Sequence, residues 1–203
     1  SSFRCLAVCR GKCFFGADHG KVWGEAPATS NLDRGKVLGI HPHSPRHFVY
    51  QGKPFFFIGK SAFALIDADW RTFIEEAQRH GFTVLRLWLC CPDLTKKHGD
   101  DRFFRNQAAG DLWPFGGTPE KPDFTHLNED YFGRLDAILR DLASKRMVAE
   151  LTLFTGGDYW PGGPFVWDEV KRRYVQFVLD RYRNQLNLYY EIANEYSSSE
   201  AQA

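Results

Sequence analysis

The sequence predicts an α/β fold built on a parallel sheet, and three observations lead to this prediction. Four apolar runs with the β-branched and aromatic content of buried strands lie between residues 54 and 196. Segments with one apolar face at helical spacing separate these runs. Each run is joined to the next by a connection long enough for the crossover that parallel strands require. Strict alternation of strands and helices is typical of a parallel sheet covered by helices.

The first predicted unit begins after a turn at residues 50–53, where Gln51-Gly52 interrupts the apolar pattern. The run Pro54–Gly59 is predicted to be the first buried strand. A helix is predicted from Asp69, a favourable N-cap residue, to Gly81, a favourable stop. Its core-facing stripe consists of Trp70, Phe73, Ile74 and Ala77.

The second predicted strand, Thr83–Cys90, is apolar except for Arg86. A buried guanidinium is costly unless it pairs with a carboxylate or a ligand. Arg86 is therefore either part of a structural ion pair or a residue directed at a functional site, and the sequence leaves both alternatives open. The connection that follows, residues 91–127, is rich in glycine and aromatic residues. Connections of this length inside a compact domain are often functional.

The remaining units follow the same scheme. A helix from Glu129 to about Arg146, capped by Asn128, leads into a third strand, Met147–Phe154. A second glycine- and aromatic-rich loop, residues 155–167, precedes a helix that opens at Asp168 or Glu169. The predicted inward stripes of the two helices are Leu135, Ile138, Leu139 and Leu142 in the first and Val170, Tyr174, Phe177 and Val178 in the second.

The fourth predicted strand, Tyr189–Tyr196, contains an Asn194-Glu195 pair near its end. In parallel α/β sheets the loops after the strands meet at one face, so the two aromatic loops and Glu195 are expected to share that face. Aromatic rings around a cleft suit the apolar face of a sugar ring, although the same rings can instead pack the loops themselves. The polar pair can likewise be the start of a solvated loop.

Composition restricts the classes of partner. Lysine and arginine number 26 against 25 acidic residues, so the net charge of +1 provides no field to recruit nucleic acid or an anionic membrane. No apolar run reaches the roughly 18 residues of a membrane span, and Leu6-Ala7-Val8 is too short for the apolar core of a signal peptide. Residues 1–40 show neither structural period and are predicted to be an irregular extension, with residues 41–203 forming the domain.

Cysteine and histidine spacing give little support for a metal. Cys5, Cys9 and Cys13 resemble the three-cysteine motif of radical-SAM enzymes, but the last gap is one residue too long and no strand precedes it. The histidines at 41, 43 and 47 are spaced by prolines and lack an acidic or cysteine ligand nearby. We therefore predict no metal and no other cofactor, and a metal or iron–sulfur protein stays a remote alternative.

Several blocks between His41 and Tyr196 resemble the first half of the (β/α)8 barrel of clan A glycoside hydrolases, near the cellulase-like family 5 group, and in particular the apiosidase-like domains. The blocks are His41-Pro42 with Pro45–Phe48, Gly52–Gly59, Gly81–Trp88, Tyr131-Phe132 with Leu135-Asp136, and Ile192–Tyr196. The resemblance implies about four strand–helix units of a TIM barrel. It also implies retaining hydrolysis of O-glycosidic bonds in a plant or microbial polysaccharide, and favours an extracellular location.

The resemblance also implies residue roles. Glu195 is expected to be the general acid/base, and Asn194 to hydrogen-bond the sugar 2-hydroxyl. Arg86 is expected to orient or neutralise a second carboxylate. Two positions depart from the apiosidase-like pattern: Lys60 stands where Asp is usual and Phe63 where Trp is usual. The remaining residues that we predict to contact substrate are Trp88, Trp113, Asp158, Tyr159 and Trp160.

The expected partner of Glu195 lies outside the four predicted units. In this clan the nucleophile is a Glu at the end of the seventh strand, and retention requires two carboxylates about 5–5.5 Å apart. We therefore expect an incomplete barrel that lacks the nucleophile. Asp158 is the local candidate on the correct face, because Glu150 and Glu191 lie below the strand tips and are expected to be buried or at the bottom.

A half barrel leaves the first and fourth strands as open edges, which favour aggregation unless they are covered. We expect the chain to be part of a longer enzyme, or the edges to be covered by self-association or by a second chain. The alternative function is a carbohydrate-binding half barrel without catalysis.

Overall fold

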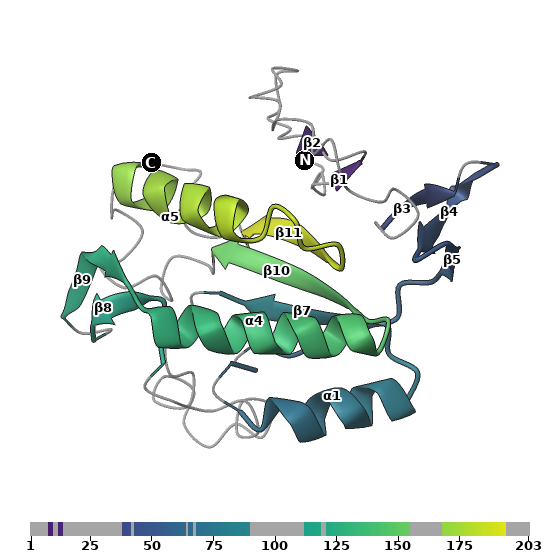
Figure 1. The fold of residues 1–203 in the computed structure, drawn as a ribbon, viewed down its shortest axis with the longest axis horizontal. Coiled ribbons are helices and arrows are strands. Elements are labelled where there is room, and N and C mark those ends of the chain that lie inside the picture. The colour runs from purple at the N-terminus through teal and green to yellow at the C-terminus, as the bar shows by residue number, and fades with distance from the viewer. Residues whose placement is uncertain are drawn as a thin grey trace.

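The computed structural model describes residues 8–9, 12–13, 38–41, 43–63, 65–66, 68–89, 112–118, 121–154 and 168–193. Within these residues, a four-stranded sheet has the strand order β11-β10-β7-β6, and all neighbouring pairs are parallel (Figure 1). The prediction of an α/β fold with a parallel sheet is confirmed. The strands of this sheet are β6 (Gly59–Ser61), β7 (Val84–Trp88), β10 (Val148–Phe154) and β11 (Leu188–Ala193).

The connecting helices are α1 (Trp70–Arg79), α4 (Glu129–Ser144) and α5 (Asp168–Arg181). Side-chain hydrogen bonds and a glycine turn mark the ends of these helices. The Asp69 side chain accepts a hydrogen bond from the Thr72 amide at the start of α1, and the Asn128 side chain accepts from two amides at the start of α4. After α1 the chain turns at Gly81, whose φ of 80° favours glycine. The predicted caps and helix positions are confirmed.

The main core lies between the helices and one face of the sheet, here called the outer face. Leu85 and Leu87 on β7 and Leu151 and Leu153 on β10 point into this core and are almost fully buried. The predicted helix stripes meet these strands, with Phe73, Val170 and Phe177 only partly buried. The fully buried stripe residues include Ile74, Ala77, Leu135, Ile138, Leu142 and Val178.

The prediction of a single first strand over Pro54–Gly59 is wrong. Residues Lys53–Phe55 instead form β5, which pairs antiparallel with β4 (Ser44–Tyr50), and the first strand of the parallel sheet is β6. Between them Phe56, Phe57 and Ile58 are exposed. In the turn before β5, Gln51 and Gly52 both have positive φ and reverse the chain, so that β5 pairs with β4.

A small antiparallel sheet covers the amino-terminal ends of the parallel strands (Figure 1). It consists of β3 (Gly39–His41), β4 and β5. Tyr50 and Phe55 pack against Val84 and Val148, the first residues of β7 and β10, and all four side chains are buried. This apolar group is here called the plug. It covers the amino-terminal end of the inner face of the sheet, the face opposite the outer face. Leu38 also packs against it, so these contacts begin slightly before the predicted domain start at residue 41.

Two further hairpins were not predicted. The long connection after β7 contains an antiparallel pair, β8 (Phe115–Gly117) and β9 (Pro122–Leu127), at the end of the molecule opposite the plug (Figure 1). Gly117 has a φ of 72°, and a Cβ there would lie 2.4 Å from a backbone oxygen. The predicted extension contains a short pair, β1 (Val8–Cys9) and β2 (Lys12–Cys13). None of the described helices is long and apolar enough to cross a membrane.

Candidate active site

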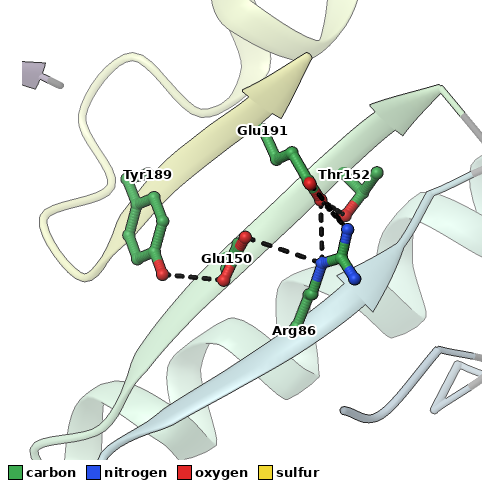
Figure 2. Close-up of polar contacts among 5 residues, drawn as sticks. All are labelled: Arg86, Glu150, Thr152, Tyr189 and Glu191. Carbon is green, nitrogen blue, oxygen red and sulfur yellow. Dashed lines mark hydrogen bonds and ion pairs between the residues drawn. The ribbon is translucent and has the colours of Figure 1, made fainter. Parts of the chain in front are cut away.

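Polar side chains occupy the middle of the face of the parallel sheet that points away from the helices. Alternation along a strand places Arg86 of β7 on the side opposite Leu85 and Leu87. The register sets Glu150 of β10 directly beside Arg86 and also beside Tyr189 of β11. Thr152 of β10 and Glu191 of β11 form the next pair on this face, two residues further along these strands. We call Arg86, Glu150, Thr152, Tyr189 and Glu191 the inner-face cluster, which Figure 2 shows.

Arg86 and Glu191 form the strongest contact of the cluster. The Nε and Nη2 atoms of Arg86 donate to the Glu191 carboxylate over 2.8 and 2.6 Å. The Thr152 hydroxyl donates to the same carboxylate over 2.6 Å. The side chains of Arg86 and Glu191 are 23% and 24% exposed. A two-point guanidinium–carboxylate contact fixes the direction as well as the distance of both groups.

Glu150 is the second carboxylate of the cluster and has a different environment. Its Oε2 accepts a hydrogen bond of 2.8 Å from the Tyr189 hydroxyl, while its Oε1 lies 3.6 Å from Arg86 Nε. Burial raises the pKa of Glu150, and the nearby charge of Glu191 adds to the increase, against opposing effects of Tyr189 and Arg86. Two carboxylates therefore share one guanidinium, and Glu150, which has the weaker contact with it, has a raised pKa.

Aromatic residues pack next to Arg86 on the side toward the carboxyl end of β7. Trp88, two residues further along β7, stacks on Phe63 with ring centroids 4.0 Å apart and an angle of 21° between the rings. The Arg86 guanidinium carbon lies 5.8 Å from the Phe63 ring centre. Trp88 is 5% exposed and Phe63 8%. Both rings therefore support the cluster by packing, and a substrate-binding role for Trp88 stays a prediction.

Lys60 does not belong to the inner-face cluster. It pairs with Leu85, an outer-face residue, and its ammonium group lies 4.6 Å from the centre of the Phe73 ring of α1. The next residue, Ser61, is the register neighbour of Arg86. The departure from the family pattern at Lys60 therefore concerns the helix-covered side of the sheet.

Trp113 lies in the hairpin that follows β7. It is 3% exposed, its ring contacts Phe115 and Phe124, and its Nε1 donates to the Gly117 carbonyl. Phe115 in turn contacts Tyr174 of α5. These rings pack the hairpin against the helix. The structure thus shows for Trp113 the contacts of a packing residue, and its role in binding stays a prediction.

The other predicted site residues lie outside the described part of the chain. They are Asn194, Glu195, Asp158, Tyr159 and Trp160, and the same holds for Cys5 of the cysteine motif. The described part of β11 ends at Ala193, immediately before Asn194. The roles assigned to these residues stay predictions.

Sequence reasoning underestimated Glu150 and Glu191. It placed them below the strand tips, as buried or bottom-face groups, whereas both are partly buried and join Arg86 in one network. A signal was present: polar residues recur at a spacing of two at Glu150 and Thr152 and at Tyr189 and Glu191. That spacing places each pair on one face of a strand.

Solved structures with a similar fold are glycoside hydrolases. One is a predicted glycoside hydrolase from Bacteroides vulgatus, with a TM-score of 0.60, 20% identity, and coverage of 82% of this chain and 33% of that chain. Another is a family 5 glycoside hydrolase from the same organism, with a TM-score of 0.54, 14% identity, and coverage of 79% and 33%. The endo-1,4-β-mannanase from Rhizomucor miehei gives a TM-score of 0.52, 22% identity, and coverage of 73% and 46%.

These likenesses show that the described fold corresponds to part of the (β/α)8 barrel of these structures. The chain spans between a third and a half of the length of these structures. Residues 43–202 match the sequence model of the apiosidase-like catalytic domain, so the chain belongs to that family. No curated protein matches the chain.

Proposed function

We propose that this chain supplies part of the active site of a retaining glycoside hydrolase that cleaves O-glycosidic bonds in a plant or microbial polysaccharide. The observation that carries the proposal is the match to the apiosidase-like catalytic domain over residues 43–202, a range that contains every predicted site residue from Arg86 to Glu195. The fold shared with a family 5 glycoside hydrolase and an endo-1,4-β-mannanase supports a saccharide substrate.

In the proposed mechanism Glu195 donates a proton to the leaving glycosidic oxygen and later removes a proton from the attacking water. This role requires a carboxyl group that keeps its proton near neutral pH, which a partly desolvated cleft provides. Asn194 hydrogen-bonds the sugar 2-hydroxyl, and this bond strengthens as positive charge develops on the ring. Trp88, Trp113, Tyr159 and Trp160 are proposed to line the cleft.

The nucleophile is proposed to lie in a strand beyond the four described here, with Asp158 as the candidate within this chain. We propose that Arg86, which Glu191 holds on the inner face, orients or neutralises this nucleophile. A cation close to the nucleophile favours its ionised form, which attack on the sugar carbon requires.

The test is an assay of aryl-glycoside hydrolysis alongside measurement of oligosaccharide binding. We expect Glu195→Gln to lower kcat by about 10²–10⁴-fold with little change in binding, because the general acid is lost. Glu75→Gln, the same chemical change at an exposed position of α1, is the matched control and should leave both unchanged. Sugar binding without turnover, unaffected by Glu195→Gln, would instead support the non-catalytic carbohydrate-binding half barrel.

We also propose that the outer strands of the described sheet, β6 and β11, pair with further strands of the same protein, of a second copy or of a second chain. Each is paired on one side only within the described residues. Unpaired parallel strands expose backbone donors and acceptors that favour association. Measurement of the solution mass tests this: a stable monomer of this chain alone would contradict both the self-association and the second-chain versions.

A further inference from the structure

The charges of the inner-face cluster do not balance. Arg86 is the one cation among its five residues, and Glu150 and Glu191 are two acids. Arg86 makes its two-point contact with Glu191, whereas its distance of 3.6 Å to Glu150 is too long for a hydrogen bond. A second partly buried negative charge that shares its cation with another acid is incompletely compensated, which favours uptake of a proton by its carboxyl group.

Burial and the charge of Glu191 favour this proton uptake, against the opposing effects of Tyr189 and Arg86. Glu150 lies on β10, which runs between β7 and β11. Arg86 faces it from β7, and Tyr189 and Glu191 face it from β11 (Figure 2). Below it lies the plug, whose buried members Val84, Val148, Tyr50 and Phe55 supply no charge. Burial is the largest contribution to the raised pKa of Glu150.

We propose that Glu150 is a positioning residue that controls how firmly Arg86 is held by Glu191. When Glu150 carries a proton, Arg86 pairs with Glu191 and not with Glu150. When Glu150 releases that proton to solvent, its carboxylate competes with Glu191 for the same guanidinium. The catalytic consequence rests on the proposed function, since the Arg86–Glu191 pair lies below the position assigned to the acid/base.

The strand register makes this exchange of partners feasible without movement of the backbone. Arg86 and Glu150 are direct neighbours across β7 and β10, so side-chain rotation alone brings them into contact. Glu191 lies one pair further along, and the Thr152 hydroxyl continues to hydrogen-bond it when Arg86 moves away. Each carboxylate therefore has a neutral donor, Tyr189 or Thr152, and the two acids share one cation.

The direct test is nuclear magnetic resonance of the Arg86 Nε–H group in the full chain, with the signal assigned by its loss in Arg86→Lys. We expect the wild-type signal to move with pH through one transition whose midpoint lies above 4.5, the ordinary pKa of a glutamate side chain. Glu150→Gln mimics the protonated carboxyl and should abolish the transition. Glu75→Gln should retain it, because that side chain is exposed on α1. A wild-type signal that is constant with pH, or a transition that persists in Glu150→Gln, would overturn the proposal.

Kinetics of the protein with an aryl glycoside supply the second readout. We expect Glu150→Leu, which removes both the proton site and the Tyr189 contact, to lower kcat by up to about 100-fold with a smaller change in KM. Glu150→Gln should recover much of kcat and show a flatter pH profile. If the Arg86 transition is present but no glycoside is cleaved even when the strand that supplies the nucleophile is included, the proposed function fails and the positioning role stands. If the transition is absent, the positioning role fails whatever the activity.

Discussion

The two faces of the parallel sheet are built by the same strands on different physical principles. Leu151 and Thr152 are consecutive on β10, and both are fully buried. Leu151 points into the apolar core beneath the helices, whereas Thr152 donates a hydrogen bond to Glu191 in the inner-face cluster. The outer face is held by burial of apolar surface, which has no direction. The inner face is held by hydrogen bonds and ion pairs, which fix geometry.

This difference between the two faces predicts which substitutions affect folding and which affect the candidate site. Apolar burial contributes most of the stability of a domain, while a partly buried ion pair contributes little net stability after desolvation. Substitutions on the outer face should therefore unfold the protein, and those on the inner face should alter the orientation and protonation of the cluster. Four predictions test this division, from the largest expected effect to the smallest.

Leu151→Ala should cause the largest loss. Removing a fully buried leucine side chain from the core between the sheet and the helices leaves a cavity, and we expect the free energy of unfolding to fall by about 2–5 kcal/mol. Urea denaturation followed by circular dichroism measures the change. A loss below that of Thr152→Val would contradict the division between the faces.

Arg86→Met should cost less, about 1–3 kcal/mol, because the pair it removes is partly exposed and its net contribution is small. The loss arises from two carboxylates that remain close together without a cation. The same substitution should make unfolding more sensitive to pH, since one of the two acids must then protonate. Denaturation at several pH values measures both effects, and a pH-independent loss would argue against the charge imbalance.

Thr152→Val keeps the shape of the side chain and removes the hydroxyl that donates to Glu191. We expect a loss of about 1.5 kcal/mol in the free energy of unfolding, at the lower end of the range for one hydrogen bond to a charged group. The comparison with Leu151→Ala is direct, because the two positions are adjacent and equally buried. Equal losses at both positions would show that packing, and not bonding, dominates the inner face.

Glu150→Gln should produce the smallest effect, which depends on pH. The pKa of Glu150 is raised in the folded protein above its ordinary value of 4.5. Its contribution to stability is therefore fully present below the unfolded pKa and is lost as pH rises through the folded pKa. The variant lacks this loss, so its stability relative to wild type should increase as the pH rises above 4.5. A constant difference across this range would contradict a raised pKa.

The sequence sufficed to predict the helices and the order of the sheet, because those features depend on local signals. Asp69, Asn128 and Gly81 act within a few residues of the helix ends that they define. The apolar stripes repeat within each helix. The alternation of elements then requires parallel strands, whatever the details of packing.

The first strand was misplaced because the strand-favouring run Phe55–Ile58 does not reveal where the chain changes its pairing partner. The change is set by a distant residue. The Thr83 hydroxyl donates to the Phe56 carbonyl and accepts from the Ile58 amide, so the backbone between β5 and β6 is bonded to a side chain 25 to 27 residues further along the chain. Propensity in a short window contains no such information.

The inner-face cluster was only partly predictable for a related reason. The sequence left Arg86 as either a structural ion pair or a site residue, and its carboxylate partner Glu191 lies 105 residues away along the chain. Which side chains meet across a parallel sheet depends on register, and a shift of one residue would turn each of them to the other face. Arg86 proves to be ion-paired, and its place in a catalytic site stays a prediction.

The plug has a consequence for the order in which the chain folds. The β4–β5 hairpin closes over a two-residue turn and can form in microseconds by itself. Its attachment to the domain, in contrast, spans great sequence distances, as in the contact between Arg146 and the Tyr50 carbonyl 96 residues away. Loop closure over such distances is slow, so the hairpin must wait for β7 and β10 to pair before it can dock. The amino-terminal end of the sheet is thus sealed only after its central strands have paired.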